Sequence, residues 1–89
     1  MQTHDLAISN RLGLHARACA KIVHIASRFQ CKVSLVVKGR RASARNIVAV
    51  MLLTASVGTT VRLETDGPDE AAAMDAIVAL IGDYFGEGQ

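Results

Sequence analysis

Aromatic residues are rare in this chain, and long apolar runs are absent. It has one tyrosine, two phenylalanines and no tryptophan, and its formal net charge is only +2. Proteins that contact the bases of nucleic acids stack them on aromatic side chains and have strongly basic surfaces. This composition therefore argues against a nucleic-acid partner. No run of about 18 apolar residues occurs, so we expect no membrane-spanning helix and no stable membrane association. The core must be built mainly from aliphatic side chains.

Cysteines and metal-ligand patterns are also scarce. Cys19 and Cys31 form neither a metal-binding signature nor a disulfide framework, and we expect reduced thiols that pack in the core. No three of these cysteines and the histidines His4, His15 and His24 have the spacing of a metal site, so we predict no metal ion. The sequence also lacks a Walker phosphate-binding loop and paired catalytic carboxylates. We therefore expect no cofactor.

The length of 89 residues predicts a single domain over residues 1–89. A chain of this size buries roughly 60% of its unfolded surface, so one modest core is feasible without disulfides. Residues 1–5 carry no basic segment ahead of an apolar stretch, which argues against a secretory signal. Together with the reduced thiols, this predicts a cytoplasmic protein, and we expect a monomer.

Charge is distributed unevenly along the chain. All ten lysines and arginines lie between Arg11 and Arg62, whereas seven of the eight acidic residues lie between Glu64 and Glu87. Ordinary solvation of the surface would account for this pattern. A basic face for acidic partners, with an acidic face elsewhere, would account for it equally well. Both interpretations stay open at this point.

Short alternating stretches predict four strands, and apolar residues three and four positions apart predict three helices. The expected order is β-α-β-β-α-β-α. Strands and helices with one apolar face each predict an α+β fold, an open-faced sandwich with a four-stranded antiparallel sheet and three helices on one face. The strands are expected to begin at residues 6–8 and to include 32–37, 40–44 and 59–65, with helices over 16–29, over 47–53 and from residues 66–69 onward.

Several residues mark the ends of these helices. Asn46 is predicted to cap the helix over 47–53, because asparagine is among the best N-cap residues. Pro68 suits the start of the last helix, and acidic residues at 69 and 70 suit its positive end. Gly86 is a plausible stop. The last helix is expected to bury a stripe made of Met74, Ile77, Val78, Leu80, Ile81, Tyr84 and Phe85.

Two surfaces are predicted to face partners. One is a basic strip along one side of the helix over 16–29. The other is the short helix over 47–53, which is apolar nearly all round, so that any part left exposed would form a docking patch. We expect the basic strip to contain Arg17, Lys21, His24 and Arg28, and the docking patch to contain Ile47, Val48 and Met51.

The most informative segment is Leu12-Gly13-Leu14-His15-Ala16-Arg17, which places a histidine where a helix begins. The first N–H groups of a helix have no partner within it, and the helix dipole adds positive charge there. A phosphoryl group on His15 would meet these N–H groups, from Ala16 and Arg17, and the guanidinium of Arg17. A neutral imidazole has the lone pair needed to attack phosphorus. The segment therefore suggests a histidine that receives and passes on phosphate.

At this point the chain resembles the HPr family, the histidine-containing phosphocarriers of the bacterial phosphotransferase system. The resemblance covers essentially the whole chain. It rests on the order of five features, which are Gly13-Leu14-His15-Ala16-Arg17, Gly39 in a strand turn, Asn46-Ile47, Gly67-Pro68-Asp69-Glu70 and Phe85-Gly86-Glu87.

This resemblance implies a βαββαβα open-faced sandwich and a carrier that is not itself an enzyme. It implies that His15 is phosphorylated on Nδ1, with Arg17 close by. The phosphoryl group would come from enzyme I, itself charged by phosphoenolpyruvate, and would go to enzyme IIA proteins or domains.

The chain departs from the family pattern at three positions. Ala18 stands where the family usually has proline, and Cys19 stands where a small residue is expected. Asn46 occupies the place of a serine that a dedicated kinase phosphorylates in many members, and an amide cannot take that phosphate. Ser43 is out of register with this motif.

Two alternative functions stay open. A carrier of the nitrogen-related phosphotransfer branch would share the motif around His15. A non-catalytic regulatory module that only docks on partners would not need it, and intact His15 and Arg17 argue against such a module. A small-molecule-binding domain is a weaker alternative, because no cluster of convergent polar residues is evident.

Overall fold

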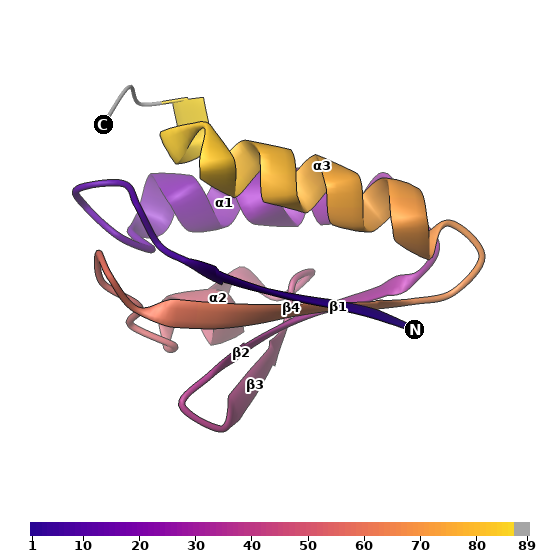
Figure 1. The fold of residues 1–89 in the computed structure, drawn as a ribbon, viewed down its shortest axis with the longest axis horizontal. Coiled ribbons are helices and arrows are strands. Elements are labelled where there is room, and N and C mark those ends of the chain that lie inside the picture. The colour runs from indigo at the N-terminus through magenta and orange to yellow at the C-terminus, as the bar shows by residue number, and fades with distance from the viewer. Residues whose placement is uncertain (87–89) are drawn as a thin grey trace.

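Four strands form one antiparallel sheet in the computed structural model, which describes residues 1–86 (Figure 1). The strand order is β1-β4-β2-β3, so the first and last strands of the sequence lie side by side. Leu35 pairs with Leu63 on one side and with Ala42 on the other, and all three are buried on the same face. The strands are β1 (Gln2–Ala7), β2 (Lys32–Val37), β3 (Arg40–Ser43) and β4 (Thr60–Asp66).

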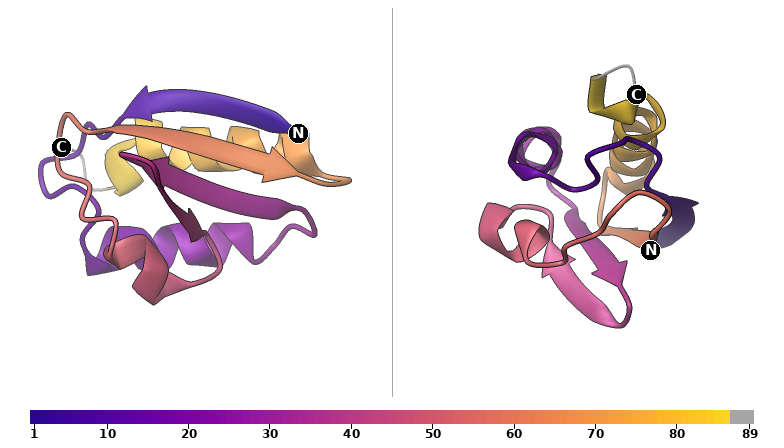
Figure 2. Two further views of the ribbon diagram at one scale, coloured as in Figure 1. Left: turned by 90° about the horizontal axis from the view of Figure 1, so that it is seen from below. Right: turned by 90° about the vertical axis from the view of Figure 1, so that its left-hand side faces the viewer.

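Within the described residues, three α-helices cover one face of this sheet (Figure 2). They are α1 (Ala16–Ala26), α2 (Ile47–Met51) and α3 (Glu70–Gly82), and a short 3-10 turn, η1 (Tyr84–Gly86), follows α3. This confirms the predicted βαββαβα open-faced sandwich. Glu87, the last residue of the family-like ending, lies outside the described residues.

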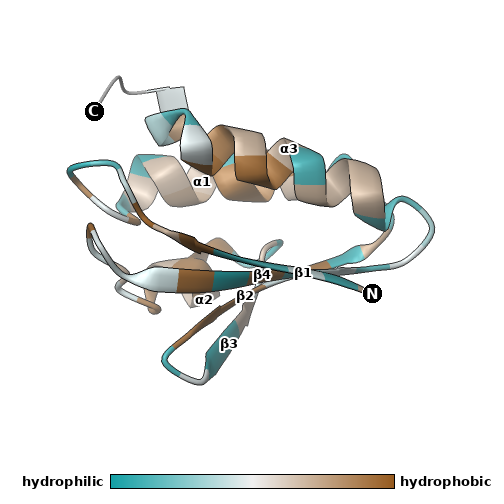
Figure 3. Cartoon of the chain, viewed as in Figure 1, coloured by the Kyte–Doolittle hydropathy of each residue, from teal (hydrophilic) through white to brown (hydrophobic). Residues whose placement is uncertain are grey.

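An aliphatic core fills the space between sheet and helices. The apolar positions of α1 and α3 and alternate strand positions carry the hydrophobic colour in Figure 3, while the loops are largely polar. Ile22 of α1, Leu35 and Leu63 of the sheet and Ile77 of α3 are all fully buried. Burying each such side chain contributes about 1.5–3 kcal/mol. Phe85 joins them from η1, so the turn after α3 also belongs to the core.

Several predicted boundaries were wrong at the ends of elements. β1 starts at Gln2, not near residue 6, because its outer residues pair with β4 through the backbone while their side chains face solvent. α1 ends at Ala26 rather than at residue 29. After Ala26, the N–H groups of Arg28 and Phe29 donate to carbonyls three residues earlier in the chain. Such bonds tighten the last turn and end the α-helix.

The two later helices are also shorter than expected. α2 ends at Met51, and Thr54 then adopts a positive φ of 51° that no helix can contain. α3 stops at Gly82 and not at Gly86. Tyr84 has a positive φ of 53°, which turns its side chain out of the predicted buried stripe and leaves it 38% exposed.

The start of α3 is tied to the loop after α1. The carboxylate of Asp69, the N-cap residue of α3, accepts hydrogen bonds from the N–H groups of Gln30 and Cys31, both at 2.9 Å. The bond from Gln30 lowers the pKa of Asp69 below its usual value, with a further contribution from Cys31. A carboxylate that is more acidic when folded stabilises the fold above its unfolded pKa of about 4, and this stabilisation is lost as the pH falls through the lower folded value.

We therefore expect Asp69→Asn to be more destabilising at neutral pH than at low pH. Urea unfolding of the unmodified chain and the variant, measured at pH 7 and in a series down to about pH 2, gives the difference in free energy of unfolding at each pH. The difference in free energy of unfolding between the unmodified chain and the variant should become smaller as the pH falls below about 4. A difference that stays constant over this range would show that the charge of Asp69 does not stabilise the fold.

Candidate functional site

His15 is the N-cap residue of α1, with extended backbone angles and a half-buried side chain. The first hydrogen bond within the helix runs from the Cys19 N–H to the His15 carbonyl, over 3.0 Å. The N–H groups of residues 16–18 precede this bond and point toward the helix start. The His15 side chain makes no capping bond to them. The predicted arrangement of a histidine beside the open end of a helix is therefore present.

A tight turn over residues 10–14 places His15. Asn10 is fully buried, and its Nδ2 donates to the carbonyl of Gly13 over 2.8 Å, while the Gly13 N–H donates back to the Asn10 carbonyl. The Leu14 N–H then donates to the Ala55 carbonyl over 2.8 Å. These bonds fix the segment immediately before His15 against the loop after α2. Sequence reasoning identified this segment only as a turn and missed Asn10 as a positioning residue.

Gly13 packs closely against the loop after α2. Its φ is +65°, a region that costs other residues energy, and a Cβ placed there would lie 2.6 Å from the Ala55 carbonyl oxygen and 2.9 Å from the Ser56 Cα. Both neighbours are backbone atoms, which cannot rotate away. Glycine is therefore required by space as well as by backbone conformation.

The basic strip lies along a groove between α1 and α3. Arg17, Lys21, His24 and Arg28 line this hollow of about 360 Å³, together with Ala20, Ile25 and Leu80. Three of its members also have bonds within the protein. Lys21 donates its Nζ to the carbonyl of Phe85, and Arg28 lies 3.1 Å from Nε2 of His24. The structure thus brings the four residues together, and their role in partner binding stays a prediction.

The docking patch is exposed as its proposed role requires. Val48 is 61% exposed and Met51 and Ile47 about 40%, whereas Val50 on the opposite side of α2 is fully buried. Sequence reasoning missed Leu52, which is 64% exposed and extends the patch. Its signal was present in the uniformly apolar run, but only packing decides which side of such a run faces solvent.

The docking patch lies close to the start of α1. α2 contacts α1, and Figure 2 shows it beside the first half of that helix. Leu12, in the turn before His15, is 66% exposed and was also missed. The acidic start of α3 lies at the opposite end of the molecule from the start of α1 (Figure 1). Exposed apolar side chains and the first residues of the basic strip therefore lie near the end of the molecule where α1 begins.

Asn46 caps α2 as predicted. Its Oδ1 accepts a hydrogen bond from the Ala49 N–H over 3.1 Å. We expect Asn46→Ala to lower the free energy of unfolding by about 0.5–2 kcal/mol. Because serine also caps helices well, Asn46→Ser should stay within a few tenths of a kcal/mol of the unmodified chain. Urea unfolding of the three proteins tests this order. Equal stability of all three would show that the cap contributes nothing.

The two cysteines are buried and form no disulfide with each other. Burial raises the pKa of both thiols, and the carboxylate of Asp69 adds to this effect at Cys31. Thiols of raised pKa form little of the reactive thiolate at neutral pH, in keeping with packing residues. Among the described residues, no group of three potential ligands could hold a metal ion, and no helix is long and apolar enough to cross a membrane.

Comparison with known proteins gives matches over nearly the whole chain. A family model described as "PTS HPr component phosphorylation site" matches residues 2–83. The phosphocarrier protein HPr of Cupriavidus necator is 52% identical over 89 residues and covers 100% of both chains. The HPr of Xylella fastidiosa is 48% identical over 87 residues, or 98% of each chain.

Solved structures agree with the sequence matches. HPr-C-His from Thermoanaerobacter tengcongensis matches with a TM-score of 0.94 at 37% identity and covers 98% of each chain. HPr from Bacillus anthracis matches with a TM-score of 0.86 at 28% identity, over 90% of this chain and 95% of that one.

Proposed function

Because this chain belongs to the HPr family, whose members are phosphocarrier proteins of the phosphotransferase system and not catalytic enzymes, we propose that it carries a phosphoryl group on His15. The group comes from phosphorylated enzyme I and goes to enzyme IIA proteins or domains, in sugar uptake and its regulation. The observation that carries this proposal is His15 at the N-cap of α1, beside Arg17 and the N–H groups of the first turn.

The transfer is an in-line exchange between histidines of successive proteins. The lone pair on Nδ1 of His15 forms a bond to phosphorus as the N–P bond on the donor histidine breaks, and that electron pair returns to the donor ring. The N–H groups of Ala16 and Arg17 and the Arg17 guanidinium bind the oxygens of the group in transit. Arg17 is exposed, so water weakens its hold and the group can be released to the next protein.

Partners dock on the surface around His15. The basic strip attracts acidic partners and acts mainly on the association rate, while the docking patch supplies affinity through burial of Ile47, Val48 and Met51. Both surfaces are shared by enzyme I and the enzyme IIA proteins, so these bind one at a time. We propose that the chain acts as a cytoplasmic monomer, although an HPr dimer from Thermoanaerobacter tengcongensis also matches with a TM-score of 0.79.

Val48→Asp is expected to weaken binding of enzyme I about tenfold or more, which corresponds to ~1.4 kcal/mol. The charge would have to be desolvated in an apolar contact. Isothermal titration calorimetry measures the dissociation constant, and thermal unfolding checks that the fold is retained. Ala72→Asp is the matched control, because Ala72 is also exposed but lies on α3. If both variants bind equally well, Val48 does not belong to the interface.

A reconstituted relay tests the proposed function. Purified enzyme I, labelled phosphoenolpyruvate and an enzyme IIA protein are mixed with and without this chain. Label should reach the enzyme IIA protein rapidly only when the chain is present. Enzyme I of the nitrogen-related branch, used in place of the sugar-branch enzyme, separates the two carriers, since faster transfer should occur with the sugar-branch enzyme. A chain that binds enzyme I yet passes on no label would be a docking module.

A further inference from the structure

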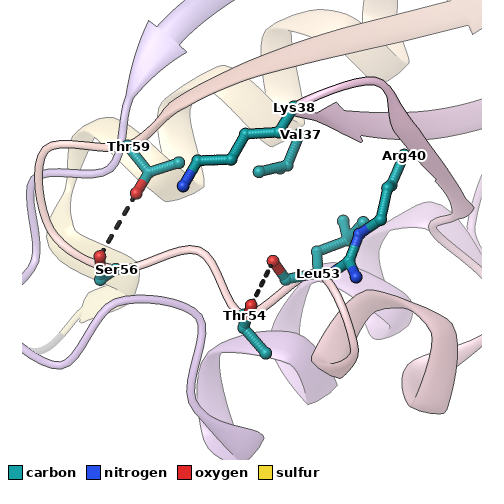
Figure 4. Close-up of a pocket in the computed structure, with 7 residues that line it drawn as sticks. All are labelled: Val37, Lys38, Arg40, Leu53, Thr54, Ser56 and Thr59. Atoms are coloured by element: carbon teal, nitrogen blue, oxygen red, sulfur yellow. Dashed lines mark hydrogen bonds between the residues drawn. The ribbon is translucent and has the colours of Figure 1, made fainter.

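A polar cavity lies away from the groove along α1. It has a volume of about 330 Å³ and lies between the β2–β3 turn and the loop that connects α2 to β4 (Figure 4). Val37 and Leu53, both nearly fully buried, supply its apolar floor. The other residues that line it are Lys38, Arg40, Thr54, Ser56 and Thr59, so it combines two cations with three hydroxyls and, among the described residues lining it, no acidic group.

The two cations are directed to this cavity by the hairpin. Lys38 and Gly39 form the turn, both with positive φ, and Val37 pairs with Arg40 across it. Paired residues share one face of a sheet, and Val37 faces the core. Arg40 is therefore a cation on the core side of the sheet, at the end where the β2–β3 turn lies. In Figure 4 the Lys38 side chain extends over the cavity toward Thr59, and the Arg40 guanidinium lies beside Leu53.

The donors around the cavity are partly fixed in place. Arg40 donates one Nη2 bond to the carbonyl of Leu52, which holds its guanidinium while the remaining N–H groups stay available. The Ser56 and Thr59 hydroxyls lie 3.3 Å apart, and when one donates to the other, the second can still donate to a ligand. A fixed guanidinium loses less side-chain freedom on binding than a mobile one.

We propose that this cavity binds a small phosphate ester with a hydroxylated carbon body. The phosphate carries close to two negative charges, which match Lys38 and Arg40, and a planar guanidinium binds two phosphate oxygens at once. The hydroxyls of the ligand contact Ser56 and Thr59, and its carbon atoms lie over Val37 and Leu53. A carboxylate would carry half the charge and leave one cation unmatched.

The site is distinct from His15 but adjacent to the segment that positions it. Ala55, between Thr54 and Ser56, accepts the hydrogen bond from the Leu14 N–H, and Gly13 packs against Ser56. The cavity and the turn over residues 10–14 thus lie against the same loop. A test must therefore separate binding in the cavity from binding of an anion at the start of α1.

Titration with glycerol 3-phosphate at constant ionic strength, followed through backbone amide resonances, tests the proposal. We expect saturable changes at residues 37–40 and 53–59, with weaker binding of inorganic phosphate and none of glycerol. Lys38→Gln and Arg40→Gln should each weaken binding at least fivefold. Lys32→Gln is the matched control, because Lys32 is an exposed lysine at the other end of β2. This variant should bind glycerol 3-phosphate as tightly as the unmodified chain does.

Three results would overturn the assignment. Changes centred on His15 and Arg17 alone would place the anion at the helix start. Equal affinity of the Lys38→Gln, Arg40→Gln and Lys32→Gln variants would show that general charge attracts the ester. If inorganic phosphate binds as tightly as the ester, the hydroxyl groups of the ligand contribute nothing to binding in the cavity. Because Lys38 lies exposed in the turn, its variant keeps the test valid even if Arg40→Gln disturbs the hairpin.

Discussion

His15→Ala is expected to accept no phosphoryl group from enzyme I and to remain folded. The substitution removes the nucleophilic ring nitrogen, for which Arg17 and the backbone N–H groups cannot substitute. The side chain of His15 is only half-buried, so we expect the variant to keep its fold without it. Labelled phosphoenolpyruvate with enzyme I measures acceptance, and urea unfolding measures stability.

His24→Ala and His4→Ala are the matched controls, since both residues are exposed histidines elsewhere in the chain. Each should accept a full equivalent of phosphoryl group, although His24→Ala removes a member of the basic strip and should accept it more slowly. Label retained by His15→Ala, or lost in His4→Ala, would contradict the role assigned to His15.

Gly13→Ala is expected to have the second largest effect, on both stability and transfer. The positive φ costs alanine about 1–2 kcal/mol. Contact of its Cβ with the backbone of Ala55 and Ser56 adds about 1–3 kcal/mol, as in an overpacked core. Separation of the two loops would strain the Leu14–Ala55 hydrogen bond and displace His15, so phosphoryl acceptance should also slow at least tenfold.

Gly39→Ala is the matched control for this prediction. Gly39 also has a positive φ, of 80°, but no atom lies within 4 Å of the position of its Cβ. The Gly39→Ala variant should lose only the stability that the positive φ costs alanine. Its rate of phosphoryl transfer from enzyme I should be unchanged. Unfolding by urea and single-turnover transfer, measured on both variants, separate the two contributions. Equal losses of stability in Gly13→Ala and Gly39→Ala would show that the contact with residues 55 and 56 is not tight.

The order of the elements was predictable because most of them carry their own periodic pattern. β2 was predicted with the correct ends, since Val33, Leu35 and Val37 alternate with polar or half-buried neighbours in a strand at the centre of the sheet. The ends of α1 and α3 were not predictable in this way. They depend on local bonds such as that from Phe29 to Ala26, and on positive φ values after α3, which no hydrophobic pattern encodes.

The candidate site likewise has some features that the sequence predicts and others that only the folded structure shows. The positions of His15 at the start of α1 and of the cap Asn46 at the start of α2 were predicted from local rules for helix starts, whereas the roles of His15 and Arg17 in transfer stay predictions. The role of Asn10 in the turn and the bond made by Lys21, a predicted member of the basic strip, depend on contacts that form only in the folded chain. Asn10 is buried beneath the turn it holds, and Lys21 bonds to the Phe85 carbonyl, 64 positions away in the sequence.

The intact mass of the unmodified chain, after incubation with enzyme I and phosphoenolpyruvate, tests the role of His15 most directly. If His15 is the carrier, the mass rises by one phosphoryl group, the group is lost in acid and kept in base, and fragmentation places it on His15. A mass that stays unchanged with active enzyme I, or a group that survives acid or maps to a serine or to another histidine, would contradict that role.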